Sequence, residues 1–200
     1  MQWVFGPIRV ELGCIATIVR GASPRPISKF VTDSEDGIPW IKIGDVEKDS
    51  KYVTKTKEKI TRAGSVKSRF VHKGDFIMSN SMSFGRPYIL EIDGCIHDGW
   101  LALSDFESVC EADYLYHYLL TDDMQHTMRQ NASNGTVQNL NADIVRKLVI
   151  TLPPFSDQSR IVSILDKFDD LTSSISTGLP KEIEQRQKQY EYFRDKLLRF

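Results

Sequence analysis

Hydrophobic and polar positions in the first 152 residues alternate in short runs, a pattern typical of a domain that mixes α and β structure. Runs of β-branched and aromatic residues bounded by glycine, proline or aspartate predict strands. They lie at 37–43, 76–79, 88–92, 100–103 and 148–152. Apolar residues spaced three and four apart predict a helix over about 112–131. Its expected buried side consists of Leu115, Leu119, Leu120, Met124 and Met128, and a polar loop over 131–141 follows.

The pattern changes at Pro153 and Pro154, after which two long stretches of helical periodicity follow. Ser156 is the expected N-cap of the first helix, because its hydroxyl can accept a hydrogen bond from a free amide of the first turn. Gly178-Leu179-Pro180 separates the helices, since glycine suits a C-terminal cap and proline suits the first turn of a new helix. We therefore predict an α+β protein, with a mixed α/β domain over 1–152 and a helical spacer or dimerisation region over 153–200.

One apolar stripe runs along each predicted helix. The first contains Ile161, Ile164, Phe168, Leu171 and Ile175. The second contains Ile183, Tyr190 and Leu197, seven residues apart, with Phe193 on the adjoining seam. Such stripes on helices of about 20 residues, or about 30 Å, favour pairing with other long helices in an antiparallel coiled coil or bundle. A helical hairpin folded on itself is the alternative that the pattern leaves open.

Composition narrows the class of protein. The 200 residues are 40% hydrophobic and 26% charged, as in a soluble globular protein, and no apolar run approaches the roughly 20 residues that span a bilayer. The first residues lack the pattern of a signal peptide, so we expect a cytoplasmic protein that does not contact a membrane. Cys14, Cys95 and Cys110 are odd in number and widely spaced, which favours three buried reduced thiols over a disulfide or a zinc site.

The distribution of charge is more informative than the formal net charge of −1. Between Lys51 and Leu90 nine basic residues face two acidic ones, a sum of +7, whereas the stretch from Glu91 to Gln125 has nine acidic residues and no lysine or arginine. Such asymmetry indicates one side that faces nucleic acid. It is equally compatible with ordinary solvated faces, so the charge alone does not decide.

Motifs of enzymes that act alone are missing from the sequence. An amino-methyltransferase needs a polar residue before Pro-Pro-aromatic, but Leu152 precedes Pro153-Pro154-Phe155, and neither a Phe-x-Gly-x-Gly cofactor loop nor a P-loop is present. The four histidines have no metal-ligand spacing. His97-Asp98 could form an acid–base pair, but no nucleophile is visible nearby. We therefore expect no catalytic residue, no metal site and no cofactor.

Several segments resemble the specificity subunits of type I restriction–modification systems. The run Leu-Pro-Pro-Phe-Ser-Asp-Gln-Ser-Arg-Ile-Val at 152–162 and Ile-Leu-Asp-Lys-Phe-Asp at 164–169 resemble the junction where a target-recognition domain passes into a helical spacer. The stretch 178–198, which begins Gly-Leu-Pro-Lys-Glu-Ile-Glu, is the most specific match. The runs 37–45 and 74–79 resemble landmarks of the recognition domain. Members of this family usually carry two recognition domains and two spacers, whereas this sequence has one of each.

The resemblance implies that the 1–152 domain reads a short half-site in double-stranded DNA and takes part in no catalysis. The spacer would hold two recognition domains apart and dock methyltransferase subunits, which modify adenine at N6, while a separate ATP-driven restriction subunit cleaves. A second copy of the chain, or another specificity half, is the expected pairing partner, and a pair of identical halves would read inverted copies of one half-site. The alternative is a coiled-coil assembly or adaptor protein that reads no sequence.

Two kinds of residue are candidates for DNA contact. Phosphates are expected to meet the basic segment, because neutralising them supplies much of the affinity. The candidates there are Lys55, Lys57, Lys59, Arg62, Lys67 and Arg69, and Lys42, outside this segment, is a further basic candidate for DNA contact. Base edges are read by arginine, asparagine, glutamine and serine, which occur in loops at 23–26, 80–86 and 134–139. The candidates there are Arg25, Asn80, Ser81, Ser83, Arg86, Asn134, Thr136 and Gln138. Gly85 and Gly135 would let the backbone approach DNA closely, although asparagine, serine and glycine also dominate ordinary turns.

Overall fold

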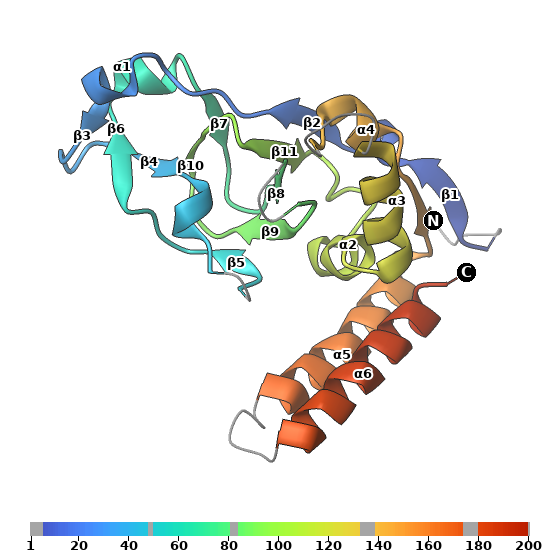
Figure 1. Cartoon of the computed structure of the whole chain (residues 1–200). Coiled ribbons are helices and arrows are strands. Elements are labelled where there is room, and N and C mark those ends of the chain that lie inside the picture. Colours follow the sequence, from blue (N-terminus) through green and yellow to red (C-terminus); the bar gives the residue numbers. More distant parts are fainter. Residues whose placement is uncertain (1–5, 48–49, 81–83, 133–138, 174–179, 200) are drawn as a thin grey trace.

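The computed structural model describes residues 6–47, 50–80, 84–132, 139–173 and 180–199. Two five-stranded sheets lie side by side, and helices cover the second of them (Figure 1). The first sheet, called the outer sheet here, has the order β3 (Val31–Thr32), β6 (Glu58–Ile60), β4 (Ile38–Ile41), β10 (Gly94–Ile96), β7 (Arg69–Val71). The second, the inner sheet, has the order β2 (Thr17–Arg20), β11 (Trp100–Ser104), β8 (Phe76–Ser79), β9 (Pro87–Leu90), β5 (Tyr52–Val53). A separate antiparallel pair joins β1 (Ile8–Glu11) to β12 (Val149–Leu152).

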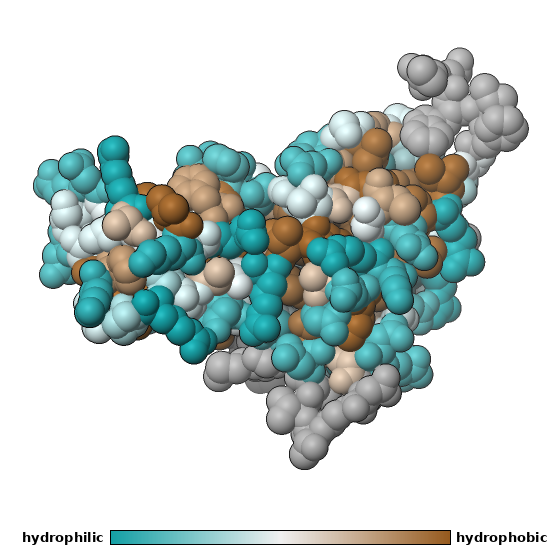
Figure 2. Space-filling view, turned by 90° about the horizontal axis from the view of Figure 1, so that it is seen from above, coloured by the Kyte–Doolittle hydropathy of each residue, from teal (hydrophilic) through white to brown (hydrophobic). Residues whose placement is uncertain are grey.

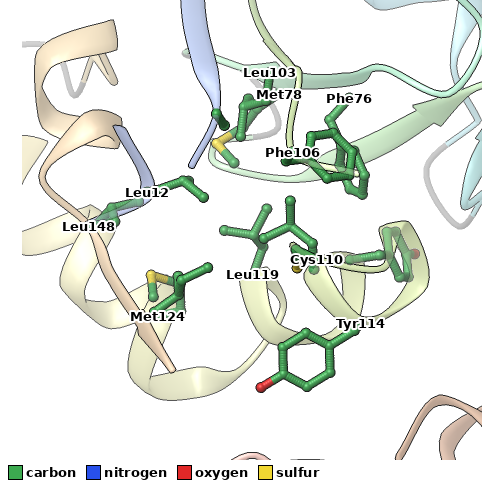
Figure 3. Packing of buried hydrophobic residues seen from close by; sticks show 14 of the residues in the cluster. Leu12, Phe76, Met78, Leu103, Phe106, Cys110, Tyr114, Leu119, Met124 and Leu148 are labelled. Carbon is green, nitrogen blue, oxygen red and sulfur yellow. The ribbon is translucent and has the colours of Figure 1, made fainter. Parts of the chain in front are cut away.

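The predicted strands are confirmed where the sequence has near-continuous apolar runs. Strands β8 and β9 are buried at all four positions, and β11 at its first four, as expected for strands covered on both faces. One core lies between the two sheets and contains Tyr88 and Trp100, whose rings meet edge to face at 5.8 Å. The larger core lies between the inner sheet and the helices, where Phe76 and Phe106 face Leu119 of helix α2 (Figure 3). These cores fix the inner sheet as the scaffold of the molecule.

The predicted helix over 112–131 is wrong as one element, because it is two: α2 (Ala112–Leu119) and α3 (Asp122–Ala132). The hydroxyl of Thr121 donates to the carbonyl of Tyr118 at 2.8 Å and accepts from the amide of Met124 at 3.4 Å, so it ends one helix and caps the next. Four of the five predicted apolar residues are buried, and Leu120, at the break, is only partly buried. Short helices α1 (Arg62–Ser65) and α4 (Ala142–Arg146), and 3-10 turns at Leu12–Cys14, Ile27–Lys29 and Ile43–Asp45, were not predicted.

The long C-terminal helices are α5 (Phe155–Ser173) and α6 (Pro180–Leu197), which run antiparallel beside one another (Figure 1). The prediction of Ser156 as N-cap is wrong: α5 begins at Phe155, and the carbonyl of Pro154 accepts the amides of Asp157 and Gln158. Proline does open the second helix, as predicted. The rings of Phe168 and Phe193 stack at 5.3 Å across the pair, so the two helices form a hairpin within this one chain.

The root of this hairpin shares the core of the domain. Ile161 of the predicted seam is buried there together with Tyr190, while Ile164, Phe168 and Leu197 are partly buried. Phe193 remains 38% exposed. The side chains of Leu171, Ile175 and Ile183 lie outside the described part of the chain.

All three cysteines are free, but Cys14 is exposed, which corrects the expectation of three buried thiols. Burial raises the pKa of Cys95 to about 11 and that of Cys110 to about 12.

Among the described residues no helix is both long and apolar enough to cross a bilayer.

Candidate nucleic-acid interface

The turn His97-Asp98-Gly99 connects β10 of the outer sheet to β11 of the inner sheet. The chain that leaves β2 crosses this turn closely, because the amides of Gly21 and Ala22 donate to the carbonyls of Trp100 and Ile96 at 2.9 and 3.2 Å. A side-chain carbon added at Gly21 would lie only 2.1 Å from the carbonyl oxygen of His97. Glycine is therefore needed at this crossing, and the turn has little freedom to move.

The first predicted reading loop, 23–26, is fastened to Asp98. The Ser23 hydroxyl donates to Oδ1 of Asp98 at 2.7 Å and accepts the Asp98 amide at 3.3 Å. The guanidinium of Arg25 lies 3.5 Å from Oδ2, and its side chain is 83% exposed. Nε of Arg20 donates to the Asp98 carbonyl at 2.9 Å. Arg25 thus reaches solvent from a loop that is held at its base.

Asn80, the first residue of the second predicted loop, is bound to Asp98 and to Leu140, which follows the third predicted loop. Its side-chain amide donates to the carbonyl of Asp98 at 3.0 Å, and its backbone carbonyl accepts the amide of Leu140 at 2.8 Å. Asn80 is only 5% exposed. It therefore joins the loops within the chain, where its amide is not free to read a base edge. Ser81, Ser83, Asn134, Thr136 and Gln138 lie outside the described residues.

Arg86, at the far end of the second loop, is half-buried, and its guanidinium lies over the ring of Tyr88 at 5.8 Å. Gly85 has a φ of +69°, and a side chain there would meet the sulfur of Met128 at 3.2 Å. The carbonyl of Gly85 also accepts Nε2 of Gln125 at 3.2 Å. Backbone conformation and packing on α3 explain this glycine, so the expected close approach of DNA is not needed to account for it.

The predicted phosphate-binding residues gather on the outer sheet and its connections, but their surroundings differ. Nζ of Lys42 lies 2.5 Å from a carboxylate oxygen of Glu58, and those of Lys57 and Lys59 donate to backbone carbonyls. The remaining four are exposed: Lys55, Arg62, Lys67 and Arg69. In Figure 2 the left part of the upper face is mostly hydrophilic, whereas larger apolar areas lie toward the right.

An apolar residue that was not predicted also lies on this surface. Val66, which directly follows α1, is 87% exposed, beside Lys67. Its turn is firmly built: the Thr61 hydroxyl caps the amide of Gly64 at 3.2 Å, and a side-chain carbon at Gly64 would lie 2.9 Å from Cβ of Phe30. The signal was available, since 59–74 contains five basic residues and no acidic one around Val66. Apolar side chains contact thymine methyl groups or wedge between bases in DNA complexes.

Lys51, which was counted in the basic segment, is used inside the protein. Its ammonium lies 2.6 Å from Asp113 and 3.6 Å from Asp166 of α5, above the ring of Tyr116. Burial alone would lower the pKa of Lys51, but the hydrogen bond and charge of Asp113 outweigh it, and the pKa is raised. The charge of Lys51 is therefore paired with carboxylates at the junction between the domain and the hairpin.

Within the described chain, the group of side chains that most resembles a metal site also lies at this junction. His117, Asp166 and Asp169 have ligand atoms within 4.8 Å of one another. However, the two ring nitrogens of His117 already contact Tyr190 and Asp166, each at 3.2 Å, and the ammonium of Lys51 supplies a positive charge. These contacts fit a structural junction better than a metal site.

The family model for the type I restriction modification DNA specificity domain matches residues 9–185. The chain belongs to this family. A putative type I restriction enzyme specificity subunit of Haemophilus influenzae is 35% identical over 196 residues, which is 96% of this chain and 48% of that protein. A type I restriction enzyme specificity subunit of Escherichia coli is 36% identical over 112 residues, 56% of this chain and 28% of that protein.

The fold agrees with this assignment. The HsdS subunit of Thermoanaerobacter tengcongensis superimposes with a TM-score of 0.68 at 20% identity, over 100% of this chain and 46% of that one. This specificity-domain chain therefore spans about half the length of the relatives that it matches from end to end.

Proposed function

We propose that this specificity-domain chain recognises one part of a two-part site in double-stranded DNA and positions adenine-N6 methyltransferase subunits, with a restriction subunit where one exists. It would act in the cytoplasm and perform no chemistry itself. The observation that supports this most strongly is that two segments predicted to read bases, 23–26 and the start of 80–86, are both bound to Asp98. Arg25 projects from that point, and exposed basic residues lie on the adjoining outer sheet. Phosphate contacts would position the chain and loop contacts would specify the sequence.

The methylation pattern of the host genome tests this function. Cells that carry the gene and its methyltransferase are compared with cells in which only this gene is deleted, by mapping N6-methyladenine. Loss of one gapped motif on deletion is the expected result. An unchanged map in cells whose methyltransferase is expressed and active would contradict a specificity role and favour the adaptor alternative.

We propose that 153–200 is the spacer, and that α6 pairs with another spacer helix in a coiled coil or bundle. Tyr190 is not available for this pairing, since it is 7% exposed and contacts His117 within the chain. Tyr192, two residues further along the same helix and next to Phe193, is 61% exposed. Exposed aromatic side chains on a long helix favour burial against a partner. A second copy of this chain is the partner that would supply the other half of a two-part reader.

Replacing Tyr192 by Glu is expected to dissociate pairs, because the new charge would be buried in the interface without a partner. Light scattering should report twice the chain mass for the wild-type protein and a single chain for Y192E at the same concentration. Gln187→Glu adds the same charge at an exposed position on a different face of α6 and should leave the mass unchanged. A Y192E protein that keeps the wild-type mass would rule out this surface.

A further inference from the structure

Asp98 uses its polar atoms to bind two separate segments of the chain, residues 20–25 and Asn80. The carboxylate contacts Ser23 through Oδ1 and Arg25 through Oδ2, and the backbone carbonyl accepts both Arg20 and Asn80. The hydrogen bond from Ser23 lowers the pKa of Asp98, which favours the charged carboxylate. The residue is part of a turn that backbone hydrogen bonds hold in place, because the amides of Gly21 and Ala22 donate to the carbonyls of Trp100 and Ile96 on either side of it.

The ion pair with Arg25 has little value for stability. The Arg25 side chain is 83% exposed and that of Asp98 is 41% exposed, and exposed pairs typically contribute about 0–1 kcal/mol. What the pair does is restrict the guanidinium, whose planar fork can still donate from its other edge. A guanidinium that is already oriented loses less conformational entropy on binding. Arginine held in this way suits paired hydrogen bonds to O6 and N7 of guanine.

The charge of Asp98 points away from a general role in phosphate binding. A carboxylate at the meeting point of the loops repels phosphates, so it weakens any pose in which the DNA backbone rather than a base edge lies against Arg25. Specificity often depends on such a repulsive group as well as on an attractive one. The carboxylate therefore acts against non-specific binding while its partner arginine acts for specific binding.

We infer that Asp98 is the positioning residue of the DNA-reading surface: it holds Arg25 ready for a guanine and thereby sets discrimination between sequences, more than overall affinity for DNA. This inference rests on the proposed function. Its scope is one base position of the half-site, the one that Arg25 faces.

The test compares Asp98→Asn with Asp36→Asn, a matched loss of one charge at an exposed position of the β3–β4 turn. The full chain, co-expressed with its host's methyltransferase, is first used to select its site from randomised duplex DNA. Binding is then measured to that site, to single-base variants and to unrelated DNA. D98N is expected to lower the ratio of specific to non-specific affinity up to about fivefold, at one G·C position, with binding to unrelated DNA unchanged or stronger. D36N should leave the ratio as it is.

Arg25→Ala provides the second variant. It should lose discrimination at the same position, and the D98N/R25A double variant should lose no more than R25A alone, because the two residues act as one unit. Fully additive losses, or a D98N protein that discriminates as well as D36N, would overturn the inference. Thermal melting verifies that each variant folds. If D98N does not fold, R25A alone decides which base position Arg25 reads. Failure of the proposed function itself would look different: the wild-type complex would select no sequence.

Discussion

The free energy of unfolding is expected to fall by about 3 kcal/mol between pH 7 and pH 4, because the unfolded chain protonates His117 and the folded chain does not. His117 is fully buried. Burial, followed by the charge of Lys51, lowers its pKa from 6.5 to about 4, against the opposing effect of Asp166. Because the pKa is lower in the folded state, this stability is present above pH 6.5 and is lost as the pH falls toward 4. Urea unfolding curves at pH 7, 5.5 and 4 measure the change.

His117→Gln should remove most of this pH dependence, because the variant has no group that titrates there. His97→Gln is the comparison: burial lowers the pKa of His97 as well, but its side chain is 21% exposed, so its share should be smaller. Burial raises the pKa of Asp75, which acts with the opposite sign, because protonation of this carboxyl at falling pH favours the folded protein. If H117Q keeps the full wild-type slope between pH 6.5 and 4, another group is responsible.

This histidine matters for function because it lies where the domain meets the hairpin. His117 belongs to α2, Asp166 to α5 and Tyr190 to α6. One buried imidazole therefore links α2 to both helices of the hairpin. Under the proposed function, the spacing between two paired recognition domains would depend on how firmly each is attached to its spacer. Acid that protonates His117 is therefore expected to loosen the attachment before it unfolds the sheets.

The strands were predictable because their apolar runs are local signals, whereas several other features depend on contacts between distant segments. The pairing of β1 with β12 joins the two ends of the domain, and the residues of neither strand indicate which strand it pairs with. Lys51 and Lys55 look equivalent in the sequence, yet one is fixed by Asp113 and Asp166 while the other is exposed. Only the fold distinguishes a structural lysine from a candidate phosphate contact.

The candidate site was predictable in its parts but not in its arrangement. Three polar loops were identified from residue types that can read bases, and the structure ties the described parts of two of them, 23–26 and 80–86, to one turn. That turn was interpreted from sequence as an acid–base pair without a nucleophile, since His97 and Asp98 are adjacent. Asn80 shows the reverse error: its side chain suits adenine, but its amide donates to the carbonyl of Asp98. Residue chemistry suggested the function, and only tertiary contacts separate reading residues from supporting ones.

Replacing Lys55, Arg62, Lys67 and Arg69 together by Gln is expected to have the largest effect on DNA binding. Each phosphate contact contributes about 0.9 to the slope of log K against log salt concentration, so four lost contacts should reduce the slope by about 3.6. Raising the salt from 50 to 200 mM would then weaken the wild-type protein about 150-fold more than the variant. Fluorescence anisotropy with labelled duplex DNA over this range measures both slopes.

A matched set separates the position of these charges from their number. Arg160, Lys167, Lys188 and Lys196 are exposed on the hairpin, and replacing them by Gln changes the net charge of the protein equally. The proposed surface requires that this second set leave the slope close to the wild-type value, because the hairpin would face protein partners and the outer sheet would face DNA. An equal reduction of the slope in both sets would mean that DNA binding depends on the total charge of the protein. The phosphate contacts could then not be assigned to the outer sheet.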